Sequence, residues 1–277
     1  MSLSDYKLPL GKAAESVIDF LTGNAAGLFD GIAYCLQAFV DALLYVLQTP
    51  PPLAVICIAT LATHLAHRRL KLTLFVAAGL LLIINLGYWK ETTHTLSLVL
   101  ASGAICMAAG VPLGIAAAHH PKLYVMLRPL LDLMQTIPTF VYLIPALILF
   151  GLGEVPGLIA TVIFAIAAPV RLTHLGISSV PPPLLEAGRA FGCSRRQLLV
   201  QVELPYALPQ IMAGFTQTIM LSLSMVVIAA MVGAPGLGTL ILRAINQVDV
   251  AKGFEAGFAI VIIAIILDRV LRVPQKA

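Results

Sequence analysis

The sequence is short of charged residues. Asp, Glu, Lys and Arg make up 11% of its 277 residues, whereas a soluble domain carries about 25%. A helix that crosses a bilayer needs roughly 20 consecutive, mostly apolar residues. The shortage therefore excludes an ordinary water-soluble domain and predicts an all-α, polytopic membrane protein. The longest segments without any charged residue are 42–67, 72–89, 92–121, 133–153, 155–170 and 204–242.

Several catalytic and binding motifs are also absent. No GxxxxGK[ST] loop is present, so the chain has no phosphate cradle of its own. The absence of HExxH and GxSxG motifs argues against a membrane metalloenzyme or a serine hydrolase. The four cysteines (Cys35, Cys57, Cys106 and Cys193) are scattered without a CxxC pair, which disfavours a disulfide framework or a metal site. We therefore expect no catalytic residue, no bound cofactor and no metal in this chain.

The apolar runs predict about seven spanning helices, with uncertain ends. A short helix over 239–245 is expected on the outer surface between the last two spans. The three prolines at 50–52 separate the spans from a distinct N-terminal region. The expected spans are 53–67, 72–89, 94–118, 129–151, 156–175, 207–232 and 255–272.

The N-terminal region, residues 1–50, combines acidic and apolar residues. Many of its apolar residues recur at three- and four-residue steps, which is typical of an amphipathic helix. Such a helix lies at the membrane interface or packs on the edge of the helical bundle, and the sequence leaves both open. The region holds five of the thirteen acids, Asp5, Glu15, Asp19, Asp30 and Asp41.

The basic residues are divided unequally between the two sets of connecting segments. One set contains twelve Lys and Arg and the other contains five. Because cytoplasmic segments carry the excess of positive charge, the first set is expected in the cytoplasm, with the N-terminus outside and the C-terminus inside. The first set is Arg68, Arg69, Lys71, Lys122, Arg128, Arg171, Arg189, Arg195, Arg196, Arg269, Arg272 and Lys276; the second is Lys7, Lys12, Lys90, Arg243 and Lys252.

A polar segment, residues 181–205, interrupts the apolar runs on the cytoplasmic side. Three prolines end the preceding helix, and a short helix is predicted over 184–191. Gly192 suits the left-handed conformation that stops a helix, and Ser194 can cap a second helix over about 195–203. The segment is thus predicted to form a helix-turn-helix across the cytoplasmic mouth rather than a simple loop.

This segment resembles the EAA loop of permeases in binding-protein-dependent ABC importers. The family signature is EAA, a Gly four residues after the last Ala, nine residues, an apolar residue, any residue, then Leu and Pro. Here Glu186 and Ala187 match, Gly188 replaces the second Ala, and Gly192 falls at the expected place. Val202, Leu204 and Pro205 complete the pattern. The segments 129–138, 140–145, 224–229 and 264–269 are similar to the glycine betaine/proline/choline branch, over about residues 90–272.

The resemblance implies a type I ABC importer-like transmembrane domain over 90–277, with the coupling loop at 181–205 and two accessory helices over 51–89. It also implies a homodimer of permeases in the bacterial inner membrane, with cytoplasmic ATPase subunits and an extracytoplasmic substrate-binding protein. The solute would be a quaternary-ammonium compound such as glycine betaine, choline or proline betaine. The implied ATPase-coupling residues are Glu186, Ala187, Gly188, Arg189, Gly192, Leu204 and Pro205.

Three further residues are candidates for the translocation path. Asp132 is an ionisable group at the start of a span, although its spacing from Arg128 also fits a structural ion pair. Phe140 and Tyr142 could present aromatic faces to a quaternary ammonium group. Two other charged residues are assigned elsewhere: Arg171 is expected to snorkel to the interface, and Glu154 to lie in an outer loop.

The alternative function is a stand-alone secondary transporter or channel for a small cationic or zwitterionic solute. It would need ion-coupling residues or inverted repeats with broken helices. The sequence shows no clear repeat, and such a protein would have no use for the helix-turn-helix.

Overall fold

The computed structural model describes residues 10–271, in which every regular element is a helix. The predicted all-α class is confirmed. Three counted basic residues, Lys7, Arg272 and Lys276, and the acid Asp5 lie outside the described residues. The elements are α1 (Leu10–Gln48), α2 (Pro52–His67), α3 (Leu70–Asn85), α4 (Trp89–His119), α5 (Pro121–Thr136), α6 (Thr139–Phe150), α7 (Glu154–Ala165), α8 (Ala167–Ser178), α9 (Pro182–Ala190), α10 (Arg195–Leu198), the π-helical turn η2 (Leu199–Glu203), α11 (Leu204–Met231), α12 (Leu237–Gln247) and α13 (Val250–Leu271).

The helices that could cross a membrane differ in number from the seven expected. Within the described residues, five helical segments are long and apolar enough, and the bent pair α5–α6 makes a sixth. Helices α2 and α3 have 16 residues each, so each is about 24 Å long, less than the roughly 30 Å hydrocarbon core. Conversely, most of α1 meets the length criterion although no span was expected there.

The span expected over 129–151 is not one straight helix. A break divides it into α5 and α6, which meet at an angle of 93°. Ile137 is extended (φ −65°, ψ 130°), because the ring of the following proline disfavours the helical conformation. Pro138 is the N-cap of the new helix, which begins at Thr139 and turns away from the direction of α5.

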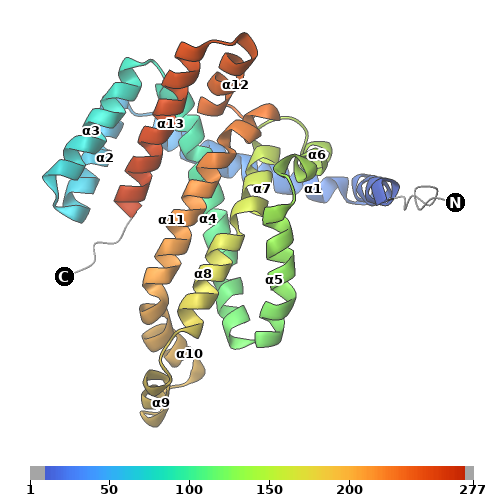
Figure 1. The fold of residues 1–277 in the computed structure, drawn as a ribbon, viewed down its shortest axis with the longest axis vertical. Coiled ribbons are helices and arrows are strands. Elements are labelled where there is room, and N and C mark those ends of the chain that lie inside the picture. The colour runs from blue at the N-terminus through green and yellow to red at the C-terminus, as the bar shows by residue number, and fades with distance from the viewer. Residues whose placement is uncertain (1–9, 272–277) are drawn as a thin grey trace.

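The long helices run side by side along the molecule, as Figure 1 shows for α4, α5, α8 and α11. Helices α9 and α10 lie at one end of this bundle, and α12 lies at the other. Helix α1 runs across the bundle near the α12 end and is kinked at Ala25 (φ −125°, ψ 15°). We call these the α9 end and the α12 end.

The main apolar core joins α3, α4, α11 and α13. Buried Val76, Val99, Leu223 and Ile263 represent the four helices in one cluster. Burial of apolar side chains gives each about 1.5–3 kcal/mol in water, but within a bilayer close packing and interhelical hydrogen bonds replace that driving force. Helix α2 adds Ile56 to the same cluster, and at its last residue His67 Nε2 lies 2.9 Å from the carbonyl oxygen of Val270 in α13.

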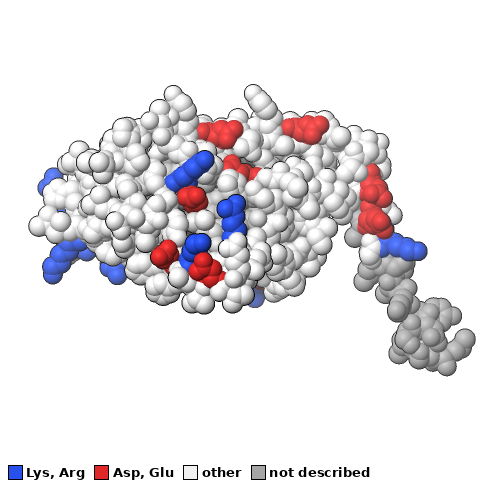
Figure 2. Space-filling model, turned by 90° about the horizontal axis from the view of Figure 1, so that it is seen from above, with Lys and Arg blue, Asp and Glu red and all other residues white. Residues whose placement is uncertain are grey.

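Charged groups are few on the surface. Figure 2 looks onto the α12 end and shows scattered charges of both signs in a mostly uncharged surface, with acidic side chains on the arm formed by α1. The first part of α1 contains Glu15 and Asp19, both exposed. Charged side chains are thus sparse at this end of the molecule.

Candidate functional site

The polar segment folds as predicted, into two helices joined by a tight turn. Helix α9 ends at a Schellman motif, in which the Cys193 amide donates to the carbonyl of Gly188 (3.1 Å) and the Gly192 amide to that of Arg189 (2.9 Å). Gly192 has φ +78°, a conformation that side chains with a Cβ disfavour. The predicted left-handed stop is confirmed, and we call residues 181–205 the coupling unit.

The second helix begins with a complete capping box. The Gln197 amide donates to Ser194 Oγ (3.4 Å), and the Ser194 amide donates to Gln197 Oε1 (2.8 Å). The cap predicted for Ser194 is therefore confirmed. Together with Gly192, it fixes both sides of a turn only a few residues long.

Gly188 allows the two helices of the coupling unit to approach closely. A Cβ at this position would lie 2.6 Å from Leu198 Cδ1 and 3.7 Å from Val202 Cγ2. Leu198 is buried by this contact. The Gly in place of the second Ala of the family signature thus permits the close approach of α9 to α10 and η2.

Within residues 10–271, no element covers the outer face of α9. Glu186, Ala187 and Arg189 are exposed. Phe191, which the sequence analysis did not single out, is 88% exposed at the tip of the unit. The sequence signal that could have identified it is an aromatic residue directly before Gly192, at the predicted turn.

The second helix continues into the next span instead of ending near residue 203. Helices α10, η2 and α11 form one uninterrupted segment, Arg195–Met231. The π-helical turn η2 lies directly before Pro205, whose ring would meet the carbonyl four residues earlier in a regular helix. A wider turn relieves that clash, and such turns are frequent at functional sites. Leu204 is half-buried and Pro205 exposed at this junction.

A carboxylate that ends η2 is paired with a histidine of another helix. His119 Nε2, on the last turn of α4, lies 2.7 Å from Glu203 Oε2. Glu203 is only 7% exposed. This pair was not predicted, since Glu203 occupies the unspecified position of the signature, His119 lies outside it, and 84 positions separate the two residues.

The three candidates for the translocation path are not on one helix. Asp132 lies on α5, whereas Phe140 and Tyr142 lie on α6 beyond the 93° bend. Phe140 is 48% exposed. The Tyr142 hydroxyl is buried without a hydrogen-bond partner among the described residues.

The suggested pairing of Asp132 with Arg128 is wrong. Asp132 Oδ1 instead accepts from Arg171 Nη2 of α8, at 2.6 Å. The partner of Asp132 is therefore determined by the packing of α5 against α8 and not by residue spacing along α5. The same contact corrects the expectation that Arg171 simply snorkels.

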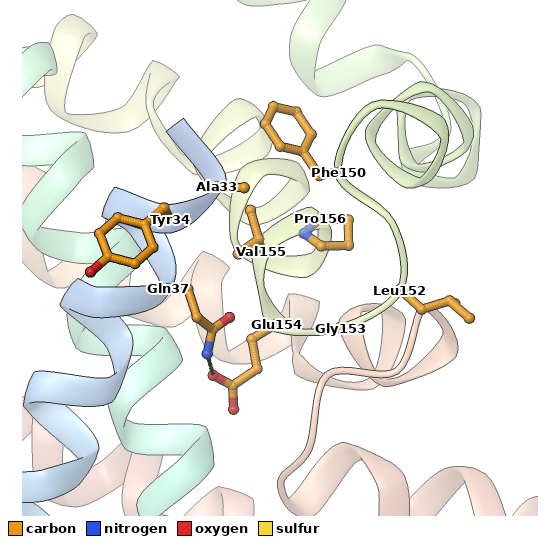
Figure 3. A pocket seen from close by; sticks show the side chains of 9 residues that line it. All are labelled: Ala33, Tyr34, Gln37, Phe150, Leu152, Gly153, Glu154, Val155 and Pro156. Atoms are coloured by element: carbon orange, nitrogen blue, oxygen red, sulfur yellow. Dashed lines mark hydrogen bonds between the residues drawn. The ribbon is translucent and has the colours of Figure 1, made fainter. Parts of the chain in front are cut away.

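The α12 end contains a second polar cluster and a pocket of about 290 Å³ between α1 and the α6–α7 connection. Glu154 lies at the start of α7 and is 8% exposed, so its assignment to an outer loop is wrong. His94 Nδ1 of α4 lies 3.1 Å from Glu154 Oε1, and Gln37 Nε2 of α1 donates to Oε2 at 3.3 Å. Figure 3 shows the Gln37 side chain directed at this carboxylate.

The cluster joins several elements to the first turns of α4. Gln48 of α1 donates to Thr93 Oγ1 (2.8 Å), and the Leu237 amide at the start of α12 donates to Thr95 Oγ1 (2.9 Å). Nearby, Tyr88 donates to Glu255 of α13 at 2.8 Å. Burial, followed by the neighbouring Glu255 carboxylate, raises the pKa of Tyr88 to about 12, so the hydroxyl remains a donor at physiological pH.

Comparison with known proteins adds three findings. The model of a family described as binding-protein-dependent transport system inner membrane component matches residues 110–276. The glycine betaine transport system permease protein OpuAB of Bacillus subtilis is 48% identical over 275 residues, covering 98% of this chain and 97% of the relative. The glycine betaine/proline betaine transport system permease protein ProW of Escherichia coli is 44% identical over 266 residues, covering 95% and 74%.

Among solved structures, the fold is similar to a chain of the inward-facing MetNI methionine ABC transporter. The TM-score is 0.60 at 22% identity, covering 67% of this chain and 94% of that chain. At this identity the likeness concerns the fold.

Proposed function

The chain belongs to the family of binding-protein-dependent transport system inner membrane components, and from this premise we propose how it works as the permease of an ATP-driven importer. The proposed cargo is a quaternary-ammonium compatible solute such as glycine betaine, choline or proline betaine. The names of the relatives support this class of cargo. The chain is a multi-pass protein of the bacterial inner membrane.

The coupling unit is the observation on which the mechanism rests. It is an ordered helix-turn-helix with an uncovered face, and its second helix continues without a break into α11. Because the sequence has no phosphate cradle, a separate cytoplasmic ATPase subunit would bind and hydrolyse ATP. The chain itself would bind no cofactor. Helix α9 would dock in a groove of that ATPase through Glu186, Ala187, Arg189 and Phe191.

The remaining partners follow from the importer architecture. Two copies of this chain would form the pathway, and an extracytoplasmic binding protein would deliver the solute to the α12 end. The excess of basic residues in the segments that include the coupling unit supports a cytoplasmic position for the α9 end. In this arrangement α1, which runs across the bundle near the α12 end, would lie at the outer membrane interface, and α2 and α3 would be accessory to the transport domain.

Asp132, Phe140 and Tyr142 remain proposals for the path. The Asp132 carboxylate is already paired with Arg171, which reduces its attraction for a cationic solute. The two aromatic rings of α6 are the stronger candidates, since ring faces attract quaternary ammonium groups.

The first test is purification of the tagged chain from its own host in mild detergent, with mass spectrometry of the proteins that accompany it. We expect an ATPase at about one copy per permease. A membrane protein that purifies alone would instead favour the stand-alone transporter or channel.

A variant can show that the ATPase binds where proposed. Glu186→Lys reverses a charge on the exposed face of α9, and we expect it to reduce the accompanying ATPase about tenfold, the effect of losing about 1.4 kcal/mol of binding. Asp30→Lys makes the same reversal on exposed α1 and serves as the control. Equal retention of the ATPase by both variants would place the docking surface elsewhere.

A further inference from the structure

Helix α4 joins the two ends of the molecule. It runs from Trp89 to His119, so its first turns lie in the polar cluster of the α12 end and its last turn lies beside the coupling unit. At each end, a histidine of α4 is paired with a buried carboxylate of another element. These pairs are His94 with Glu154 and His119 with Glu203.

The His119–Glu203 pair is set against an apolar cluster. Ile177 of α8 and Ala207 of α11 are buried in this cluster, and Ile115 of α4 packs on them. Leu199, the first residue of η2, and Leu204, which follows η2, also pack against this cluster. Glu203 is therefore a carboxylate with little access to water, and a buried charge requires a partner to remain in place. The structure gives it His119 as that partner.

Helix α9 is linked to this pair through η2. Helix α9 packs closely against α10 and η2, at a point where even a Cβ on Gly188 would lie 2.6 Å from Leu198 Cδ1, so movement of α9 also displaces η2. Glu203 is the last residue of η2. Because its carboxylate is bonded to α4 and its backbone to the start of α11, displacement of η2 acts on two long helices at once.

We propose that the His119–Glu203 pair transmits movement of the coupling unit to α4, and that α4 transmits it to α7 and α12 at the opposite end. His119 and Glu203 are positioning residues in this scheme, because they touch neither solute nor nucleotide. The inference rests on the proposed function, since it requires an ATPase docked on α9. Without the pair, nucleotide-driven movement would reach α11 while α4 lagged behind.

The test measures solute transported per ATP hydrolysed by the permease–ATPase complex in liposomes, with the binding protein and glycine betaine supplied. For His119→Ala we expect the ATPase to remain bound at the wild-type ratio while transport per ATP falls about tenfold, within the range of typical coupling effects. His119→Gln keeps a side-chain donor and should recover most of the loss. His120→Ala changes the neighbouring exposed histidine and should match the wild type.

A second variant protects the test against misfolding. Glu203→Leu replaces the carboxylate by an apolar group in an apolar cluster, so no charge is stranded, and such replacements are often tolerated. It should show the same loss of coupling as His119→Ala. The double variant should be no worse than either single one, because both remove the same interaction.

Three results would overturn the inference. Transport per ATP unchanged in both single variants would show that the pair transmits nothing. If transport and ATP hydrolysis fell in parallel in these variants, the pair would only stabilise the protein. If the ATPase no longer accompanied the variants, the His119–Glu203 pair would belong to the docking surface. Absence of an ATPase from the wild-type preparation would instead refute the proposed function, and this is seen before any variant is made.

Discussion

At the scale of single residues, the turn of the coupling unit depends on backbone conformation rather than on space. A Cβ on Gly192 would meet no atom within 4 Å, yet φ is +78°. The penalty for another residue is therefore local, about 1–2 kcal/mol for a left-handed conformation. Asn tolerates that conformation better than β-branched residues do.

The corresponding prediction compares Gly192→Val with Gly192→Asn. The Val variant should insert normally but lose about tenfold in ATPase retention and solute uptake, because the end of α9 moves. The Asn variant should stay within about twofold of the wild type, since its side chain accepts a positive φ. Uptake in cells and the ATPase recovered with the permease are the measurements, and equal behaviour of the two variants would contradict the backbone argument.

At the scale of elements, α1 has a dual character. Its outer surface carries exposed apolar side chains such as Tyr34 and Tyr45, while buried Val40 packs on Ala101 of α4 and Leu158 of α7. The interpretation of α1 as a helix packed on the bundle is therefore confirmed. Its exposed apolar face is compatible with a position at the membrane interface, which stays a prediction. The cover over Glu154 comes from the second part of the helix, after the kink at Ala25.

Deletion of residues 1–45 should preserve insertion of the remaining spans but weaken the fold. It uncovers the contacts of Val40 and removes the Gln37 donor from the buried Glu154 carboxylate. We expect the midpoint of thermal unfolding in detergent to fall by about 5 °C, a loss of roughly 1–2 kcal/mol at this size.

The matched control is deletion of residues 1–24, which stops before the kink and keeps both Gln37 and Val40. It should change the midpoint by no more than about 1 °C. An equal fall for the two deletions would assign the stabilisation to the first part of α1, and loss of the inserted protein would show that α1 is needed for insertion.

At the scale of the whole molecule, the orientation in the membrane can be tested with cysteines already present. Cys35 is exposed on α1, and Cys193 is half-buried in the coupling unit. We compare two variants that keep one of these residues and carry Ser at the other three positions. A membrane-impermeant maleimide should label the Cys35 variant in right-side-out vesicles and the Cys193 variant in inside-out vesicles, because thiol labelling requires access. The reverse pattern would invert the proposed topology.

The sequence alone determined the features that depend on neighbouring residues. Charge-free runs predicted the helices, because helix formation in lipid satisfies the backbone within one segment. Gly192 and Ser194 were identified as the stop and the cap, because the groups they satisfy lie within a few positions. The family likewise followed from short-range spacing in the coupling unit, and the comparisons confirm it.

Tertiary structure decided the partners of the charged groups and the direction of the helices. The pairs Asp132–Arg171, His94–Glu154 and His119–Glu203 join residues 39, 60 and 84 positions apart. Which side chains meet over such sequence distances depends on how the helices pack. The local periodicity of the sequence does not predict that packing. The 93° turn after α5 had a local cause in Pro138, but its direction, like the crosswise course of α1, was set by the helices against which these elements pack.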